Sequence, residues 1–304
     1  MKLSVDVIMV TYNHERYISN AIDGVLKQRT NFDVRLIIAN DCSPDRTDDI
    51  VSLYAKEYSK EREICYFRNQ TNIGGQSNFI KAHGISNAKY IAMCEGDDYW
   101  TDPYKLQKQV DLLEANPDFN ICFHKVKIEK QGSLMDDYIT APPAATTTQQ
   151  DLLKGNYIHT VSVVFRNVIK NFPDWFSKAL PGDYPLWLML TNKGEKISCL
   201  DEFLAVYRVH EGGLWSLQDK TKYNQKMYTT MMSCALYLKI KCPKFIKYYM
   251  PLLADSLYLT GFKDLDQNKY LSIALWAIRH AKFSIKQKFY FLTIGLRRFV
   301  KQRP

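Results

Sequence analysis

The segment YIAMCEGDDYW, residues 90–100, decides how this chain folds and is the most informative part of its sequence. Residues 90–94 are apolar and predict a buried strand, and the carboxylates of Asp97 and Asp98 follow that strand closely. In a sheet of parallel strands, ligands collect beyond the carboxyl ends of the strands. Two adjacent carboxylates in this position therefore predict a site for a cationic group.

The chemical identity of that group follows from the ligand type. Hard oxygen ligands suit Mg²⁺ or Mn²⁺, and a divalent ion there would most naturally carry the diphosphate of a nucleotide. A plainer interpretation is a surface turn that leads into a helix near Pro103, with Asp102 as its N-cap. Short acidic motifs also arise by chance, so the choice depends on the rest of the chain.

The first 94 residues alternate between strand patterns and helix patterns. The predicted strands are 5–11, 34–39, 64–68 and 90–94, and the predicted helices are 18–26, 47–58 and 77–85. This alternation is typical of an α/β fold with a mostly parallel, Rossmann-like sheet and flanking helices. The polar loops 11–14, 41–45 and 95–98 would then meet at the carboxyl edge of the sheet.

The pattern changes after residue 118. The predicted elements there are strands at 120–129, 160–166 and 203–210, a loop at 141–148, and helices at 183–190, 223–241, 245–260, 268–282 and 285–300. The strands give this half an antiparallel character, and the chain beyond Lys220 is helical. We expect a principal α/β domain over residues 1–219 and a basic helical C-terminal region over residues 220–304.

Composition and cysteine usage exclude several classes of protein. Hydrophobic residues make up 46% of the 304 residues, which is sufficient for a real core. The seven cysteines form an odd set without a Cys-x-x-Cys pair, which argues against a disulfide framework and against a structural zinc site. The chain starts with a strand pattern, lacks a basic leader and has no apolar stretch of membrane-spanning length, so we expect a cytoplasmic protein with free thiols.

The net charge of +9 is distributed unevenly. Residues 220–304 contain 13 Lys and 4 Arg against 3 Asp, a net charge of +14, which leaves −5 for the first 219 residues. Residues 283–303 could form a basic helix with an aromatic face that contacts an anionic membrane peripherally. The alternative is that the helices pack on the first domain and expose a solvated basic face. Nucleic acid is not an expected partner, because no recognisable binding module accompanies the charge.

Five motifs occur in an order that resembles glycosyltransferase family 2, the inverting nucleotide-sugar transferases with the GT-A fold. They are VIMVTYNH (7–14), NDCSPD (40–45), NIGG (72–75), EGDDYW (95–100) and YRVH (207–210). Each motif is weak alone, but five in sequence are strong, and the resemblance covers residues 5 to about 215. It implies an enzyme of the type that builds bacterial cell-envelope polysaccharide.

The resemblance implies a set of residues that bind the nucleotide-sugar donor. Thr11 and Tyr12 match positions that contact the base, where an aromatic ring can stack on any base. Asp41 matches the carboxylate that accepts a hydrogen bond from the base, and Gly74 belongs to a loop that approaches the nucleotide. Arg208 could pair with the diphosphate. The competing interpretations are packing for Tyr12, a turn and helix cap for Asp41, and a surface ion pair for Arg208.

The acidic motif and YRVH are expected to hold a divalent cation, Mn²⁺ or Mg²⁺. By the resemblance, Asp98 would coordinate the ion directly, Asp97 would lie against the ribose or the metal shell, and His210 would complete the shell. Glu95 stands where the family pattern has Asp, so the resemblance gives it no clear role. A histidine in this position could equally be structural.

Inverting transfer also requires a base that takes the proton of the acceptor hydroxyl, and Asp183 matches the family position at the start of a helix. The alternative for Asp183 is an N-cap. The expected reaction moves a hexose or N-acetylhexosamine from a nucleotide diphosphate, most naturally UDP, to a hydroxyl of a saccharide or lipid-linked saccharide. The rival functions are a sugar nucleotidyltransferase, whose glycine-rich basic loop is missing after the first strand, and a binding protein without turnover.

Overall fold

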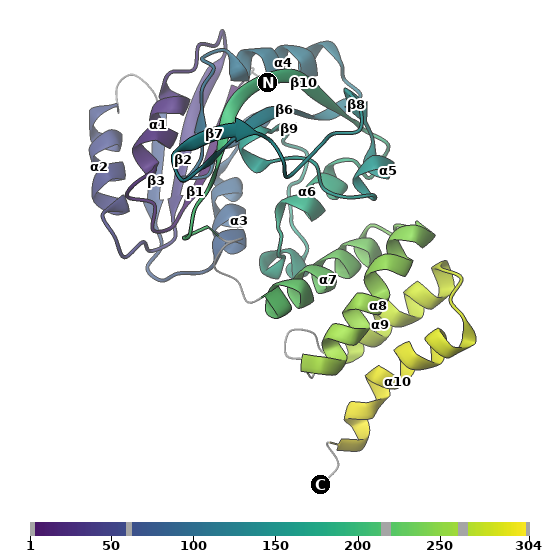
Figure 1. The fold of residues 1–304 in the computed structure, drawn as a ribbon. Helices are drawn as coiled ribbons and strands as arrows, with labels where there is room; N and C mark the ends of the chain where they lie inside the picture. Colours follow the sequence, from purple (N-terminus) through teal and green to yellow (C-terminus); the bar gives the residue numbers. More distant parts are fainter. Residues whose placement is uncertain (1–3, 59–62, 214–219, 261–266, 302–304) are drawn as a thin grey trace. The chain divides into compact units, whose positions relative to one another are not determined.

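The protein is described by a computed structural model that covers residues 4–58, 63–213, 220–260 and 267–301 (Figure 1). The chain forms two compact units, residues 1–173 with 190–217, and residues 174–189 with 218–304. The expected boundary at residue 219 lies outside the described residues, as does the end of the expected basic helix, 302–303. The expected division into an α/β domain and a C-terminal region stays a prediction.

The first unit is built on a mixed sheet with the strand order β3-β2-β1-β4-β9-β6-β10-β5, from which β7 and β8 branch. Its first half contains β1 (Ser4–Thr11), α1 (Ile18–Leu26), β2 (Asp33–Asn40), α2 (Thr47–Glu57), β3 (Glu63–Arg68), α3 (Gly75–Ile85) and β4 (Tyr90–Met93). The pairs β1–β2, β2–β3 and β1–β4 are parallel. The expected α/β fold with alternating strands and helices is confirmed.

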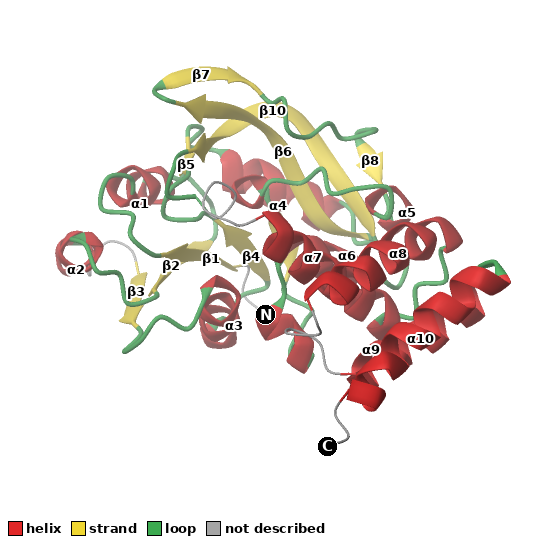
Figure 2. Ribbon diagram, turned by 60° about the horizontal axis from the view of Figure 1, so that its bottom comes forward, coloured by secondary structure: helices red, strands yellow, loops and turns green. Residues whose placement is uncertain are grey.

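The direction of the chain reverses after β3. The chain moves outward from β1 to β2 to β3, and it then crosses back over β1 to place β4 on the other side. Because parallel crossovers are right-handed, α1 and α3 must cover opposite faces of the sheet. Figure 2 shows α1 and α3 on opposite sides of the β2–β1–β4 row. Residues Val5–Met9 of β1 are buried, which explains why this strand is apolar apart from Asp6, whose buried carboxylate pairs with Arg35 at 2.8 Å.

The second half of the sheet is mixed rather than antiparallel. It contains β5 (Tyr99–Trp100), α4 (Lys105–Ala115), β6 (Phe119–Lys130), β7 (Ser133–Asp136), β8 (Thr146–Thr147), α5 (Gln149–Leu152), a 3₁₀ turn η1 (Thr160–Ser162), β9 (Val164–Arg166) and β10 (Lys196–Val209). The long strands β6 and β10 pair in parallel, whereas β9, β5, β7 and β8 pair antiparallel with their neighbours. The expectation of an antiparallel second half is therefore wrong for the pairing of β6 with β10 and agrees with the other pairs.

The strand expected at 160–166 forms only in its second part, from Val164. The hydroxyl of Ser162 donates to the carbonyl of His159 at 2.7 Å, and that of Thr160 donates to the Glu95 carboxylate at 2.6 Å. The local bond from Ser162 favours a turn over an extended chain, although the β-branched residues by themselves favour a strand, and the bond to Glu95 ties this turn to the acidic loop.

The second unit is helical. Its elements are a 3₁₀ helix η2 (Asp174–Lys178), α6 (Asp183–Leu190), α7 (Lys220–Tyr237), α8 (Pro243–Thr260), α9 (Gln267–His280) and α10 (Ile285–Lys301). The helix α6 is apolar on nearly all sides, with Leu186, Trp187 and Leu188 at most 1% exposed. A helix of this kind must be buried, which is why the segment 174–189 groups with later helices. The Leu180 backbone N–H donates to the Thr230 hydroxyl of α7 at 3.0 Å.

All seven cysteines are unpaired, in agreement with the sequence. Cys94, Cys122 and Cys234 are buried, and the other four are half-buried. Among the described residues, none of the helices combines the length and the apolar composition that a membrane crossing requires.

Candidate functional site

The candidate site lies where the strand order reverses, between β1 and β4, the position at which open α/β sheets bind ligands. The loop after β4 continues alongside β1, because the Gly96 backbone N–H donates to the carbonyl of Val10 at 3.0 Å. A Cβ atom at Gly96 would lie 2.6 Å from Thr11 Oγ1 and 2.9 Å from His14 Nδ1. Glycine therefore allows the acidic loop and the loop after β1 to touch.

Three potential metal ligands meet at this position. Nε2 of His210 lies 3.1 Å from Oδ2 of Asp97, and Nε2 of His14 lies 3.6 Å from the same oxygen. One ligand atom from each residue fits within 4.8 Å of the others. The three side chains are 14 to 20% exposed, so they are sheltered but reachable. Two imidazole nitrogens and a carboxylate oxygen form a donor set that suits Mn²⁺.

Neighbouring groups orient His14 and Asp97. Nδ1 of His14 lies 3.2 Å from the Thr11 hydroxyl, and the His14 backbone N–H donates to the Thr47 hydroxyl at 3.0 Å, which leaves Nε2 directed toward Asp97. Burial lowers the pKa of His14 although Asp97 opposes the effect, so its ring favours the neutral form that binds metals. Burial would raise the pKa of Asp97, but His14 and His210 outweigh it and hold this pKa below its usual value.

No role for His14 follows from the sequence motifs alone. Its available signal was its place in TYNH, three residues beyond the last residue of β1. Such a histidine cannot be distinguished from a structural one until the position of His210 is known, since the two are 196 positions apart. Their ring centroids lie 6.2 Å apart in the fold.

Asp98 is directed away from the three potential ligands. It is 1% exposed, and its Oδ1 accepts the backbone N–H of Arg208 at 2.8 Å. Its Oδ2 is buried without a hydrogen-bond partner among the described residues. Burial, together with the charges of Asp97 and Glu95, raises the pKa of Asp98 well above its usual value. The structure therefore places Asp97 rather than Asp98 beside His210, and the expected direct coordination of an ion by Asp98 stays a prediction.

Arg208 fixes the acidic loop from β10. Its Nη1 donates to the backbone carbonyl of Asp97 at 2.9 Å, and its Nε donates to Glu129 at 3.3 Å. Its guanidinium lies 4.3 Å from the ring centre of Tyr99 and 5.1 Å from that of Tyr17. These contacts already use much of its hydrogen-bonding capacity. They give Arg208 a positioning role, and its expected pairing with a diphosphate stays a prediction.

Glu95 also has a definite environment. Its Oε2 accepts the Thr160 hydroxyl at 2.6 Å, and its backbone carbonyl accepts the Asp98 backbone N–H at 3.1 Å. The longer side chain of Glu thus connects the acidic loop to η1.

Asp41 and Gly74 are brought together by direct hydrogen bonds. Asp41 is 2% exposed. One of its oxygens accepts from the Asn69 amide and the Ile73 backbone N–H, each at 2.9 Å, and the other accepts from the Gly74 backbone N–H at 2.8 Å. Gly74 has φ +86°, a conformation that favours glycine. Asp41 thus orders the 72–75 loop, and its expected contact with a base stays a prediction.

The two residues at the end of β1 differ in exposure. Thr11 is 3% exposed, and Tyr12 is 45% exposed. The ring of Tyr12 is therefore accessible for stacking, as its assignment to the base requires.

Asp183 belongs to a different compact unit from the three potential ligands. It begins α6 in the second unit, whereas His14, Asp97 and His210 belong to the first. Burial raises the pKa of Tyr223, and the charge of Asp183 adds to this effect. The expected role of Asp183 as a base stays a prediction.

Comparison with known proteins matches this chain to a family model and to related chains. The model of the family "Glycosyl transferase family 2" matches residues 6–172. The uncharacterized protein Rv1520 of Mycobacterium tuberculosis is 38% identical over 225 residues, which cover 72% of this chain and 63% of that protein. The chain therefore spans less than two thirds of this relative's length.

Two further proteins are similar over most of their length. The Escherichia coli protein "UDP-Glc:alpha-D-GlcNAc-diphosphoundecaprenol beta-1,3-glucosyltransferase WfaP" is 26% identical over 240 residues, 78% of this chain and 90% of that protein. The mannosyltransferase PcManGT of Pyrobaculum calidifontis, whose solved structure contains GDP-Man and Mn²⁺, matches with a TM-score of 0.57 at 13% identity, covering 100% of this chain and 89% of that one.

Proposed function

The chain belongs to glycosyltransferase family 2, and from this premise we propose that it transfers a sugar from a nucleotide-diphosphate donor to a saccharide hydroxyl, with inversion at the anomeric carbon. The observation that carries the proposal is the meeting of His14, Asp97 and His210 at the reversal of the strand order. This is the part of an α/β sheet where nucleotides bind.

A divalent cation fits this group, and of the two expected ions the imidazoles favour Mn²⁺ over Mg²⁺. The donor set of two imidazoles and one carboxylate, the neutral form favoured for His14 and the lowered pKa of Asp97 all suit metal binding. Two of the three ligands, Asp97 and His210, were expected from the sequence near the metal, and His14 is added. When bound, the ion would act as a Lewis acid that neutralises the charge of the leaving diphosphate.

The remaining parts of the site would be supplied by the chain itself. We assign stacking on the base to the exposed ring of Tyr12, and the shape of the nucleotide pocket to the loop that Asp41 holds around Gly74. Asp183 would take the proton of the acceptor hydroxyl as the oxygen attacks the sugar. An inverting displacement needs one such base on the acceptor side, so Asp183 completes the reaction without a covalent intermediate.

The donor and acceptor are proposed by chemical class. UDP-hexose or UDP-N-acetylhexosamine is the proposed donor, supported by the UDP-glucose in the name of the Escherichia coli relative. That name also contains a diphosphoundecaprenol acceptor, which supports a lipid-linked saccharide as acceptor in cell-surface polysaccharide synthesis. A cytoplasmic location with peripheral membrane contact agrees with this acceptor and stays a prediction.

The function is tested by release of nucleoside diphosphate from a panel of UDP- and GDP-sugars, with and without Mn²⁺. The full chain should be stabilised against heat by one donor in the presence of Mn²⁺, because ligands that bind the folded state raise its stability. Turnover should depend on Asp97, while Asp201→Asn, which alters an 84% exposed carboxylate of β10, should leave it unchanged. Pyrophosphate release from a nucleoside triphosphate would instead indicate a nucleotidyltransferase, and donor binding without any transfer would indicate a binding protein.

A further inference from the structure

The helices of the second unit form an open pocket of ≈ 470 Å³ with a basic lining. It is bounded by the start of α8, the end of α9 and the start of α10, and its lining residues are Pro243, Lys247, Ile278, Arg279, His280, Ala281, Lys282 and Lys288. Acidic side chains do not contribute to this lining. Nothing in the proposed transfer reaction uses these residues.

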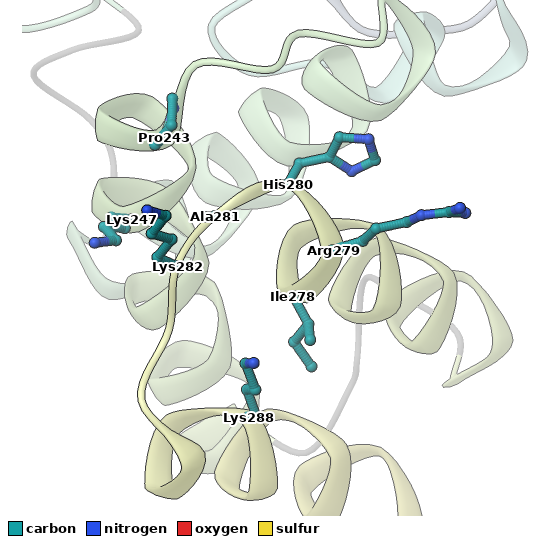
Figure 3. A pocket seen from close by; sticks show the side chains of 8 residues that line it. All are labelled: Pro243, Lys247, Ile278, Arg279, His280, Ala281, Lys282 and Lys288. Carbon is teal, nitrogen blue, oxygen red and sulfur yellow. The ribbon is translucent and has the colours of Figure 1, made fainter.

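Three lysines give the pocket its charge. Lys247 of α8, Lys282 and Lys288 of α10 all line the pocket, and in Figure 3 the tip of Arg279 is directed away from these three lysines. Among the described residues, none of the three lysines forms an ion pair. Three ammonium groups that line one pocket without a counter-charge repel one another, and a bound anion would relieve this repulsion.

The nearest carboxylate along α8 does not neutralise this charge. Asp255 lies two helical turns beyond Lys247, and it accepts a hydrogen bond from the Tyr290 hydroxyl at 2.7 Å. The positive charge of the lysine group is therefore not offset by Asp255 or by any residue of the lining. A phosphate group has the charge and the acceptor oxygens that several ammonium groups can bind together.

Exposed apolar side chains beside the pocket indicate where that phosphate comes from. Ile285 is 87% exposed and Phe289 is 70% exposed. Ile285 lies three residues before Lys288 and four before Phe289 along α10. At 3.6 residues per turn the three side chains fall within about 100° of the helix circumference, with Ile285 between the other two. A soluble phosphate would gain nothing from these apolar groups, whereas the surface of a bilayer accepts both kinds of side chain at once.

We propose that this pocket binds the phosphate headgroup of an anionic membrane lipid, and that Ile285 and Phe289 enter the bilayer surface beside it. The pocket thus gives the basic C-terminal region a defined point of membrane contact. Lys288 belongs to the basic segment that the sequence indicated and Lys282 immediately precedes it, whereas Lys247 comes from a different helix.

The test measures partition of the full chain onto vesicles of phosphatidylcholine with and without phosphatidylglycerol, by sedimentation and without nucleotide sugar. Because this test uses no nucleotide sugar, failure of vesicle binding would leave the proposed sugar transfer standing. Failure of sugar transfer would likewise leave the proposed lipid binding standing. Two triple variants carry the same loss of charge. The pocket variant is Lys247→Gln, Lys282→Gln and Lys288→Gln, and the control, on exposed lysines of the same unit, is Lys178→Gln, Lys226→Gln and Lys239→Gln.

The wild type should bind vesicles with the anionic lipid more tightly than those without it. The pocket variant should lose on the order of 100-fold in partition, since each of the three lysines near an anionic surface contributes roughly a factor of five. The control should stay within a factor of about three of the wild type, because charges beyond a Debye length from the surface are screened. Equal losses in both triple variants would overturn the pocket and indicate general charge attraction.

Two further measurements separate a lipid site from a soluble-anion site. Ile285→Ser with Phe289→Ser should abolish the binding that survives high salt, because salt screens the lysines but not the apolar contact. Pyrophosphate should release the protein from vesicles no better than sodium chloride of equal ionic strength. Stronger release by pyrophosphate, together with unchanged vesicle binding of the serine variant, would overturn the lipid assignment in favour of a soluble phosphate. Thermal unfolding of each variant verifies that it is folded.

Discussion

The substitution Gly96→Ala tests whether the contact between the acidic loop and the loop after β1 positions the metal ligands. The new Cβ would lie 2.6 Å from Thr11 Oγ1 and 2.9 Å from His14 Nδ1, where ordinary contact begins at 3.4 Å. These groups must therefore move apart by about 0.8 Å, and overpacking of this kind costs about 1–3 kcal/mol in the free energy of unfolding. Gly96 has no left-handed φ, so backbone strain does not add to this cost.

The effect on function should exceed the effect on stability. Displacing His14 changes the distance between its Nε2 and Asp97, now 3.6 Å from nitrogen to oxygen. Loss of a supporting contact weakens metal binding by roughly 10- to 100-fold, and a misplacement near 1 Å can lower turnover by about 100-fold. Urea unfolding measures the free energy of unfolding. Titration with Mn²⁺ measures the metal affinity, and release of nucleoside diphosphate measures turnover.

The matched control is Gly84→Ala. Gly84 lies in α3 and is exposed, and a Cβ atom added there would have no other atom within 4 Å. Alanine at this position should therefore leave stability unchanged or raise it by up to about 1 kcal/mol. Wild-type Mn²⁺ affinity and turnover in Gly96→Ala, with stability equal to that of the control, would refute the proposed positioning.

Three further outcomes are expected. Asp97→Asn should weaken Mn²⁺ binding by at least about 100-fold, and Asp98→Asn should weaken it by less than about tenfold. Calorimetric titration measures both affinities. The opposite ranking would support Asp98 as the direct ligand, as expected from the sequence. Asp183→Asn should retain donor affinity but lower kcat by about 100- to 10,000-fold, measured by steady-state kinetics, and an unchanged kcat would exclude it as the base. His83 is buried, and burial followed by the charge of Lys170 lowers its pKa from 6.5 to about 4, so the unfolded chain takes up a proton first as the pH falls. The stability that neutral His83 contributes is complete above pH 6.5 and is lost toward pH 4, about 2 kcal/mol by pH 5. Burial also lowers the pKa of His14 and His124, so His83→Leu still loses stability as the pH falls, but urea unfolding should show a loss about 2 kcal/mol smaller than in the wild type. Equal pH dependence of the two proteins would contradict the reasoning.

Much of the fold could be predicted because its signals are local. The runs that form β1, β2 and β4 are apolar enough to predict buried strands, and α6 was expected at 183–190, the residues it occupies. The parallel pairing of β6 with β10 was missed, since partners about 75 positions apart leave no trace in the pattern of either strand. The register and the relative direction of two paired strands depend on both strands, so neither can be read from one strand alone.

The candidate site is likewise divided into features that local sequence predicts and features that depend on residues far apart in the chain. The types of residue at Tyr12, Asp41, Asp97 and His210 could be read from short motifs, and the motif order identified the family. The hydrogen bonds that Asp41 accepts from Ile73 and Gly74 could not be predicted from these motifs, because they join loops more than 30 positions apart.

The sequence by itself determined that the carboxylates of Asp97 and Asp98 follow a buried strand and that His210 lies at the end of a later strand. It did not determine the directions of Asp97 and Asp98, because Asp97 lies in a turn that the Asp98 backbone N–H closes on the carbonyl of Glu95 at 3.1 Å. Only the tertiary structure decided which of the two faces His210. The short strand after Asp98 pairs with β10, and this pairing directs Asp98 into the sheet, onto the backbone N–H of Arg208, and leaves Asp97 beside both histidines.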